Sequence, residues 1–555
     1  MRLLNNHKNY IYIFIILVIA LAIRLVGINY GLPNNNFHSD EPKMVLPATH
    51  VAVSFVNTKN FLKLEQPEYK YPHGVMNIFS VGYIVIYYAT RVVDKIYNIS
   101  PMIFSTFDNS TFTSFARIIV AVFGSLLCLV IYLIGKEIKL NKFISFCWAL
   151  MVAVNFGLSV HSKYATRNII SVFLAYLGLY YLFKFVNIKK LLYLIIGSFF
   201  IGFAIVSSLE RAFFILPIII AIYLVSQKDL VKFFKLGLVS LLFVCIAMFT
   251  TSPYIFLNFN RFMENGLGGQ LETQSFGQIG RTALNPLYIF LNNNNVDFDQ
   301  KVPNSIAGNL TLLVFVVSLI GIYYKLLKKR DKYDLMLLSI LTFQLLVFSR
   351  YRSQMIRWYV GLFPIFLYYF IFFTLSIRSK FKYLLISIFL IGFLLNLFYS
   401  IEFSYTKTLP DTRVLAKNWM NSNLEKETIV YSTYWSANGD FKGAGIPFYY
   451  YEQKHNIHNT FAPNFKSFFC QGKLHKYQYV VVSSYVTKIY NYKESLKYYP
   501  NHSKSFIKFY NLIDKNFHLV KVISGDKLFK NSGPTLKIYK VLPSKLNCEK
   551  KVNKN

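Results

Sequence analysis

Long uncharged apolar runs recur from Ile11 to about Ser400, and they limit the possible folds more than any other feature. Each run approaches the ~20 residues that an α-helix needs to cross a bilayer. Because a backbone in lipid must satisfy its own hydrogen bonds, such runs fold as helices. Only 15% of the 555 residues are charged, against about 25% in soluble proteins. The sequence therefore predicts an α-helical polytopic membrane protein.

We expect about 11 transmembrane helices. They lie near residues 10–28, 114–134, 143–160, 168–186, 192–208, 212–226, 235–251, 306–324, 334–349, 357–377 and 382–400. The first run is too long for a signal-peptide core and no small-residue cleavage site follows it, so we expect it to be retained. A weaker run, 74–93, is interrupted by Asn77, Gly82 and Arg91.

The distribution of positive charge decides whether 74–93 crosses. The formal net charge is +35, which on a soluble chain would suggest nucleic acid. Here much of the excess lies in short loops near 136–142, 189–190, 228–235, 325–332 and 378–382. All five loops are cytoplasmic if the N-terminus is cytoplasmic and 74–93 does not cross, as the positive-inside rule requires. We therefore predict an amphipathic or re-entrant helix at 74–93 on the outer surface, and no nucleic-acid partner.

This topology divides the chain into two parts. Residues 1–400 form the membrane domain, with a large first outer loop at 29–113, and 401–555 form a soluble extracytoplasmic α/β domain. The tail carries short alternating strands at Tyr479–Ser483 and Leu536–Val541 and an amphipathic helix at Asp411–Met420. About 150 residues are enough to bury a separate core. Cys470 and Cys548 in this tail could pair if it lies outside the cytoplasm.

Two adjacent carboxylates, Asp40 and Glu41, follow the first span by about ten residues. Carboxylates at this position can act as a general base and as a metal or hydrogen-bond partner. The alternative is structural, with Ser39 or Asp40 as the N-cap of a helix and Glu41 and Pro42 in its first turn. The two interpretations are compatible, because a helix N-terminus also holds a carboxylate in place.

Several motifs follow one another along the chain. They are Arg24, Gly27, Pro33 and Asp40-Glu41, then Tyr69-Lys70-Tyr71-Pro72-His73-Gly74, Arg117, Gly135-Lys136, His161-Ser162-Lys163-Tyr164-Ala165-Thr166 and Arg357-Trp358-Tyr359 with Pro364. In this order they resemble the motifs of the membrane glycosyltransferases with the C-type (GT-C) fold, a superfamily that includes the protein O-mannosyltransferases and the lipid A aminoarabinose transferase. In the tail, Asp411, Arg413, Ala416, Trp419 and Gly533-Pro534 resemble the soluble domain of many bacterial members.

The resemblance implies that Asp40 is the catalytic aspartate and that Glu41 orients it or a metal. It also implies a second-loop site at His161, Lys163 and Asn168. The family commonly has an aspartate where this chain has Asn168. Asparagine can donate or accept hydrogen bonds but cannot act as a base. The exchange therefore argues against a two-carboxylate metal site. A divalent cation held by Asp40 and Glu41 stays an open alternative, and no other cofactor is implied.

A lipid phosphate leaving group needs cations, and arginine grips phosphate through a planar fork. Arg350, Arg352 and Arg357 crowd one predicted outer loop, and Lys70 is a further candidate. The structural alternative for these arginines is snorkelling at the interface. We expect Glu210 and Arg211 to form a simple ion pair, and Arg24 either to snorkel or to anchor Asp40.

These observations predict a glycosyltransferase of a prokaryotic cytoplasmic membrane, and the resemblance implies that it inverts the anomeric centre. Its partners would be membrane lipids, a polyprenyl-phosphate sugar as donor and an acceptor on the outer face. One rival is a transporter or flippase, although transporters place ionisable residues at mid-membrane. A second is an inactive homologue acting as a scaffold, which Asn168 keeps open. A third is an oligosaccharide ligase with a diphosphate donor.

Overall fold

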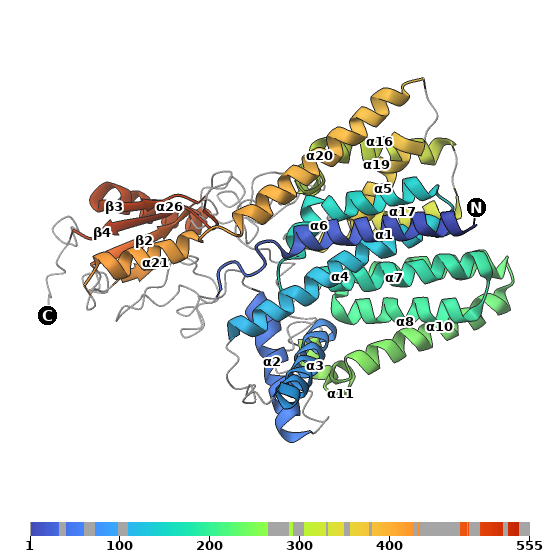
Figure 1. The fold of residues 1–555 in the computed structure, drawn as a ribbon, viewed down its shortest axis with the longest axis horizontal. Coiled ribbons are helices and arrows are strands. Elements are labelled where there is room, and N and C mark those ends of the chain that lie inside the picture. The colour runs from blue at the N-terminus through green and yellow to red at the C-terminus, as the bar shows by residue number, and fades with distance from the viewer. Residues whose placement is uncertain are drawn as a thin grey trace.

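The fold comes from a computed structural model. It describes residues 2–32, 40–59, 73–97, 109–264, 288–291, 305–328, 331–348, 356–376, 380–425, 430–432, 478–484, 487, 500–525 and 531–542. Helices dominate the described chain up to Thr406 (Figure 1).

A helix lies at each of the eleven predicted segments. These helices are α1 (Arg2–Leu25), α4 (Asn109–Glu137), α5 (Lys142–Val154), α7 (Arg167–Ile188), α8 (Leu191–Ser207), α9 (Ile215–Ser226), α10 (Leu230–Thr251), α16 (Leu312–Lys328), α17 (Lys332–Phe348), α19 (Phe363–Ile371) and α20 (Lys382–Thr406). Six helical segments of the described chain are long and apolar enough to cross a membrane, and four shorter helices are also apolar. The polytopic helical fold is thus confirmed, while the count of eleven crossings stays a prediction.

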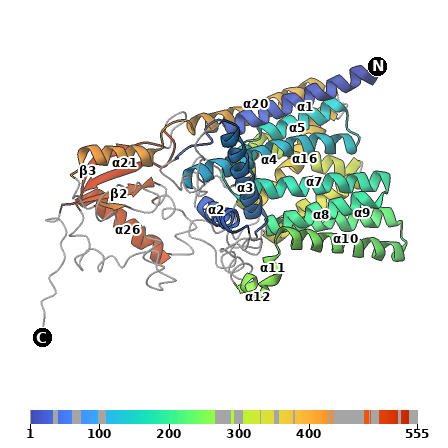
Figure 2. The same ribbon diagram turned by 60° about the horizontal axis from the view of Figure 1, so that its bottom comes forward.

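The long helices run side by side as a bundle (Figures 1 and 2). The N-terminus and the basic loops at 136–142, 189–190 and 228–235 lie at one end of it. At the opposite end α1 finishes and α4 begins, and α2 (Glu41–Thr58) and α3 (Gly74–Tyr97) pack together across the direction of the bundle. We call this the α2 end. Helix α3 contains the weak run 74–93, so the predicted helix is present and lies across an end of the bundle, while its location on the outer surface stays a prediction.

Several helices are short or interrupted. These elements are α6 (Phe156–His161), η3 (Leu209–Phe214), α11 (Tyr254–Leu257), α12 (Phe259–Arg261), α14 (Tyr288–Leu291), α15 (Ile306–Leu310), α18 (Ile356–Tyr359), η5 (Val360–Leu362) and the π-helical turn η6 (Phe372–Ser376).

Buried amides stabilise the break between α5 and α6. Asn155 accepts a hydrogen bond from the Leu158 backbone N–H at 3.0 Å and donates to the Asn309 carbonyl at 3.1 Å and to Asn396 Oδ1 at 3.0 Å. Backbone groups released at a helix break need such partners away from water. This network therefore fixes α6, and the loop after it, against α15 and α20.

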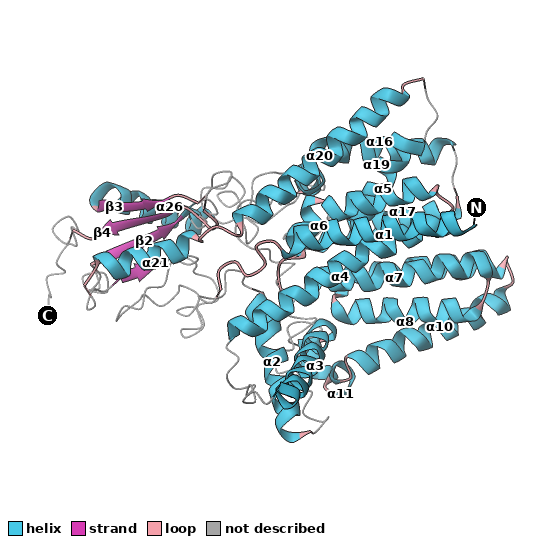
Figure 3. Cartoon of the chain, in the orientation of Figure 1, coloured by secondary structure: helices cyan, strands magenta, loops and turns pink. Residues whose placement is uncertain are grey.

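Among the described residues, strands occur only after α20 (Figure 3). The sheet has the order β1-β2-β4-β3, with β1 (Val430–Ser432) parallel to β2 (Tyr479–Ser483), and β4 (Leu536–Lys540) antiparallel to both β2 and β3 (His518–Ile523). Helix α21 (Thr412–Asn423) buries Ala416 and Met420 against the sheet, and α26 (Pro500–Asn516) precedes β3. The strands predicted at 479–483 and 536–541 are confirmed, the second ending one residue earlier. Helix α20 continues to Thr406, past residue 400.

Candidate active site

Asp40 and Arg357 meet at the α2 end of the bundle. Asp40 holds the N-cap position of α2, but its side chain makes no capping bond to the first turn. Its Oδ2 instead accepts a hydrogen bond from Nη1 of Arg357, which is 317 positions later in the sequence. Both side chains are about 15% exposed, at 16% and 14%. The structure thus pairs the predicted base with one predicted phosphate ligand.

Glu41 has a different environment from its neighbour. Its two oxygens each accept a hydrogen bond at 2.8 Å from the guanidinium of Arg117 in α4, and Oε1 also accepts the Ala165 backbone N–H at 2.8 Å. Arg117 donates in addition to the carbonyls of Ile28 and Tyr30 at 2.8 and 2.9 Å. The Glu41 and Arg117 side chains are only 2% and 1% exposed.

This buried cluster is a clamp, which we call the Glu41 clamp. It joins α2, α4, the chain after α1 and the loop after α6, and it fixes the backbone that carries Asp40. Charge-assisted bidentate contacts of this kind are among the stronger polar interactions in proteins. A cation at Glu41 would have to compete with Arg117 for the same two oxygens. Within the described ranges, no group of three His, Cys, Asp or Glu side chains could hold a metal.

The predicted second-loop residues are all buried. Lys163 contacts the end of α1 rather than Asp40. Its ammonium donates to the carbonyls of Ile23, Arg24 and Val26 at 2.6, 3.1 and 2.6 Å, and so satisfies the C-terminal end of α1. Burial, together with the positive charges of Arg24 and Lys407, lowers the pKa of Lys163 well below its usual value. This placement is that of a helix cap.

The other two second-loop residues flank the same loop. His161 ends α6 and is 4% exposed, and Asn168 lies in the first turn of α7, where its Nδ2 lies 3.3 Å from Thr166 Oγ1. The loop reaches the Glu41 clamp through the Ala165 backbone. Sequence reasoning did not foresee that a main-chain group would make this contact.

Arg24 neither snorkels nor contacts Asp40, contrary to both expectations. It is fully buried, and its guanidinium donates to the carbonyls of Ala20 and Ala153 at 3.1 and 3.0 Å and to Ser162 Oγ at 3.2 Å. Gly124 leaves room for it, because a Cβ there would lie 2.9 Å from Arg24 Nε. Arg24 thus ties α1 to α5 and to the loop after α6.

The expected ion pair between Glu210 and Arg211 does not form as such. Glu210 pairs with Arg167 at 2.9 Å and accepts a hydrogen bond from the Ser208 hydroxyl. The single carboxylate lies beside two guanidinium groups, so the cluster carries a net positive charge. A buried uncompensated charge is costly unless it has a counter-ion.

Arg211 has the unusual environment in this cluster. It is fully buried, its Nε contacts Ser171 Oγ at 3.3 Å, and neither Nη1 nor Nη2 has a hydrogen-bond partner among the described residues. A Cβ at Gly361 would lie 2.2 Å from Nη1, so glycine is needed where η5 packs on this side chain. Sequence reasoning ranked Arg211 as structural. The sequence signal that could have indicated a functional role is that Glu210 and Arg211 lie between two apolar runs.

The remaining predicted residues Lys70, Arg350 and Arg352 lie outside the described residues, as do Cys470 and Cys548. The structure therefore places Asp40, Glu41, Arg357 and the second loop at one end of the bundle. Of the four predicted phosphate ligands, Arg357 is the one that lies among the described residues, and it contacts Asp40.

Residues 99–256 match a family model described as dolichyl-phosphate-mannose-protein mannosyltransferase. A search of curated protein sequences finds no match to the chain. The structure resembles ArnT from Cupriavidus metallidurans bound to undecaprenyl phosphate, with a TM-score of 0.50, 10% identity, and coverage of 96% of this chain and 98% of that one. The Archaeoglobus fulgidus oligosaccharyltransferase AglB, in complex with an inhibitory peptide and a dolichol-phosphate, gives a TM-score of 0.46, 12% identity, and 88% and 72% coverage.

The full-length likeness to ArnT is a likeness of fold, because the identity is low. It spans both the helical bundle and the tail with the sheet. The family model covers the stretch from before α4 to α11, which includes Arg117, the second loop and Arg211. Residues 99–256 thus match a model of this family, and the fold of the whole chain is similar to that of ArnT.

Proposed function

We propose that the chain transfers a sugar from a polyprenyl-phosphate donor to an acceptor on the outer face of a prokaryotic cytoplasmic membrane. The observation that carries the proposal is the contact between Asp40 and Arg357 at the α2 end. It joins a carboxylate suited to proton abstraction and a guanidinium suited to phosphate. The undecaprenyl phosphate bound to ArnT supports a lipid phosphate as the donor's carrier.

In the proposed reaction, the acceptor hydroxyl attacks the anomeric carbon as the carbon–oxygen bond to phosphate breaks. The hydroxyl proton passes to the Asp40 carboxylate, and the polyprenyl phosphate leaves as a monoester. A single displacement of this kind inverts the anomeric centre. Glu41 does not take the proton, because both its oxygens are held by Arg117; it positions Asp40.

Arg357 links the two halves of the reaction. Without donor, Asp40 and Arg357 neutralise each other, and a carboxylate paired with arginine is a poor base. A bound phosphate offers Arg357 a second anion and frees Asp40 to accept a proton. The base would then become active only when the donor is in place.

Arg211 supplies a second, buried cation for the phosphate. Its two terminal nitrogens have no partner in the described chain, and its planar fork matches two phosphate oxygens. It packs against Gly361, four residues after Arg357. Lys70, Arg350 and Arg352 stay candidates for the same role.

The test is deletion of the gene in its host, followed by mass spectrometry of the polyprenyl-phosphate sugars. We expect one such donor to accumulate, and wild-type chain but not Asp40→Asn to clear it. Loss of a general base costs about 10²–10⁴-fold in rate, and the amide keeps the shape of the carboxylate. Full clearance by Asp40→Asn, at equal protein abundance, would show that Asp40 is not the base.

A further inference from the structure

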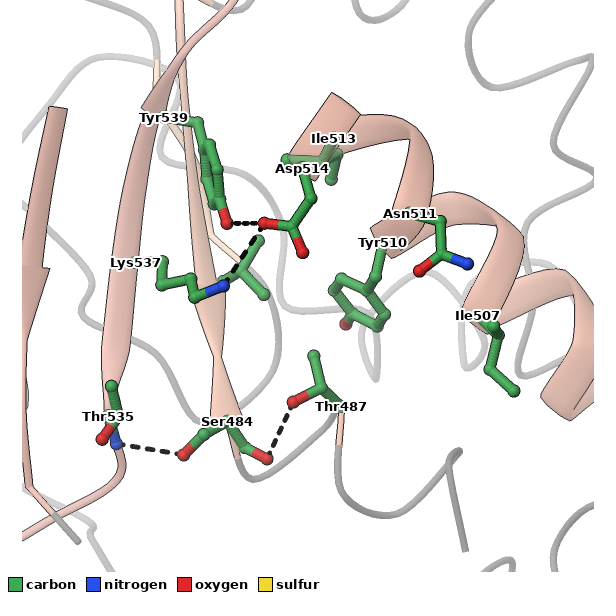
Figure 4. Close-up of a pocket in the computed structure, with 11 residues that line it drawn as sticks. Ser484, Thr487, Ile507, Tyr510, Asn511, Ile513, Asp514, Thr535, Lys537 and Tyr539 are labelled. Atoms are coloured by element: carbon green, nitrogen blue, oxygen red, sulfur yellow. Dashed lines mark hydrogen bonds and ion pairs between the residues drawn. The ribbon is translucent and has the colours of Figure 1, made fainter. Parts of the chain in front are cut away.

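A cavity of about 210 Å³ lies in the tail, between α26 and one face of the sheet (Figure 4). Tyr510, Asn511 and Asp514 line it from α26, and Lys537 and Tyr539 line it from β4. At about 30 Å³ per water, this volume corresponds to roughly seven waters. A monosaccharide is of that order of size, whereas a lipid chain or a folded peptide is larger.

One end of the cavity is built around Asp514. Its Oδ1 accepts hydrogen bonds from the Tyr539 hydroxyl and from Lys537 Nζ, the latter at 3.3 Å. Burial, with the charge of Asp514 adding to it, raises the pKa of Tyr539, so this hydroxyl stays a donor. Asp514 Oδ2 and the Asn511 amide make no hydrogen bond with other described residues and can take part in ligand contacts.

The lining selects a neutral ligand rich in hydroxyl groups. Asp514 and Lys537 are the two charged residues that line the cavity, and their charges cancel. Carboxylate, amide and hydroxyl groups together offer both donors and acceptors to a polyol. The rings of Tyr510 and Tyr539 add apolar faces, and small-molecule sites commonly combine a few placed polar groups with aromatic ones.

The other end of the cavity includes Thr535, which follows residues that contact the end of α20 and the start of α21. Ser484, Thr487 and Thr535 line it, and Thr535 N–H donates to Ser484 Oγ at 3.0 Å. Lys407, which follows α20, contacts Ser532 Oγ at 3.2 Å, and Thr412 Oγ1 in α21 donates to the Pro534 carbonyl at 2.6 Å. Helix α20 finishes at the α2 end of the bundle, where Asp40 lies.

We propose that this cavity binds one uncharged sugar unit of a saccharide acceptor, at a distance from the unit that receives the transferred sugar. This inference rests on the proposed transferase function, and it names the class of acceptor. The cavity holds the acceptor chain through a unit that does not react. The reacting hydroxyl lies elsewhere, within reach of Asp40.

Binding is tested first, on full-length protein in detergent, by saturation-transfer NMR. The probes are the methyl glycosides of glucose, galactose, mannose and N-acetylglucosamine, each offered separately. We expect saturation transfer to at least one glycoside with wild type and with Asp40→Asn. The signal should fall strongly with Thr487→Phe, which fills the cavity, and with Asp514→Asn, which keeps its shape. Equal signals in all four proteins, or none in wild type, would overturn the inference.

Lys515→Ala is the matched control, because Lys515 lies on α26 next to Asp514 but does not line the cavity. It should bind like wild type.

In transfer assays with an acceptor that contains the bound sugar, Asp514→Asn should raise the KM for that acceptor by about tenfold and leave kcat unchanged, as expected for loss of a charged hydrogen bond. Absence of glycoside binding by the wild-type protein, with intact donor clearance, would refute the cavity proposal alone. Intact binding without any donor turnover would refute the transferase proposal instead.

Discussion

The adjacent residues Asp40 and Glu41 show how environment separates two similar side chains. Glu41 is 2% exposed and accepts hydrogen bonds from Arg117 and from the Ala165 backbone, whereas Asp40 is 16% exposed and accepts a hydrogen bond from Arg357. The first arrangement fixes the backbone, and the second leaves a carboxylate that can exchange its partner. The two residues should therefore respond differently to the same chemical change.

Glu41→Gln should reduce stability more than Asp40→Asn. The amide can no longer neutralise Arg117, and breaking a buried pair by removing one charge costs about 3–5 kcal/mol. We expect a clearly lower thermal unfolding midpoint in detergent for Glu41→Gln and a midpoint near wild type for Asp40→Asn. Equal midpoints for the two variants would mean that the Glu41 clamp does not hold the fold.

Arg357→Lys should weaken binding of undecaprenyl phosphate by about tenfold, because lysine cannot form the planar fork. Asp40→Asn should bind the same lipid more tightly than wild type, since Arg357 is then free of its carboxylate. Native mass spectrometry of lipid titrations measures both. An arginine that only snorkels would tolerate lysine, and unchanged binding in both variants would remove Arg357 from the phosphate site.

At the scale of elements, the short turn η5 depends on the side chain that it covers. Gly361→Ala places a methyl group 2.2 Å from Arg211 Nη1 in the present geometry, so the guanidinium must move. We expect weaker undecaprenyl phosphate binding with expression retained. Gly237→Ala, in α10, is the control, because a Cβ there meets nothing within 4 Å. Identical lipid binding in both variants would argue against a role for Arg211.

Helix positions were predictable because apolar length is a local property. The runs at 114–134 and 168–186 fall inside α4 and α7, and the alternation at 479–483 gives β2. The side-chain contacts were not predictable, because they depend on which helices become neighbours. Lys163 satisfies the end of α1, and Arg357 reaches Asp40 over 317 positions. Nothing within a local window of sequence distinguishes a lysine that caps a helix from one that binds phosphate.

At the scale of the whole molecule, the two ends of the bundle should lie on opposite sides of the membrane. The basic loops described at one end and the sheet at the other motivate this prediction. Green fluorescent protein fused after Asn555 should be dark in a bacterial host, while alkaline phosphatase there should be active. The control is a fusion truncated after Lys139, in the loop between α4 and α5, which should fluoresce. Fluorescence from the full-length fusion would place the tail in the cytoplasm and overturn the proposed site.

The separation of Asp40 from Arg357 also orders the protein's biogenesis. Glu41 can find Arg117 once 76 further residues have been made, so the Glu41 clamp can begin to form early. Asp40 must wait for 317 residues, which is roughly 15–60 seconds at a synthesis rate of 5–20 residues per second. During that interval its carboxylate has no arginine partner at the membrane surface. A ribosome that stalls before α18 therefore leaves an anchored chain in which the proposed pair of Asp40 and Arg357 is incomplete.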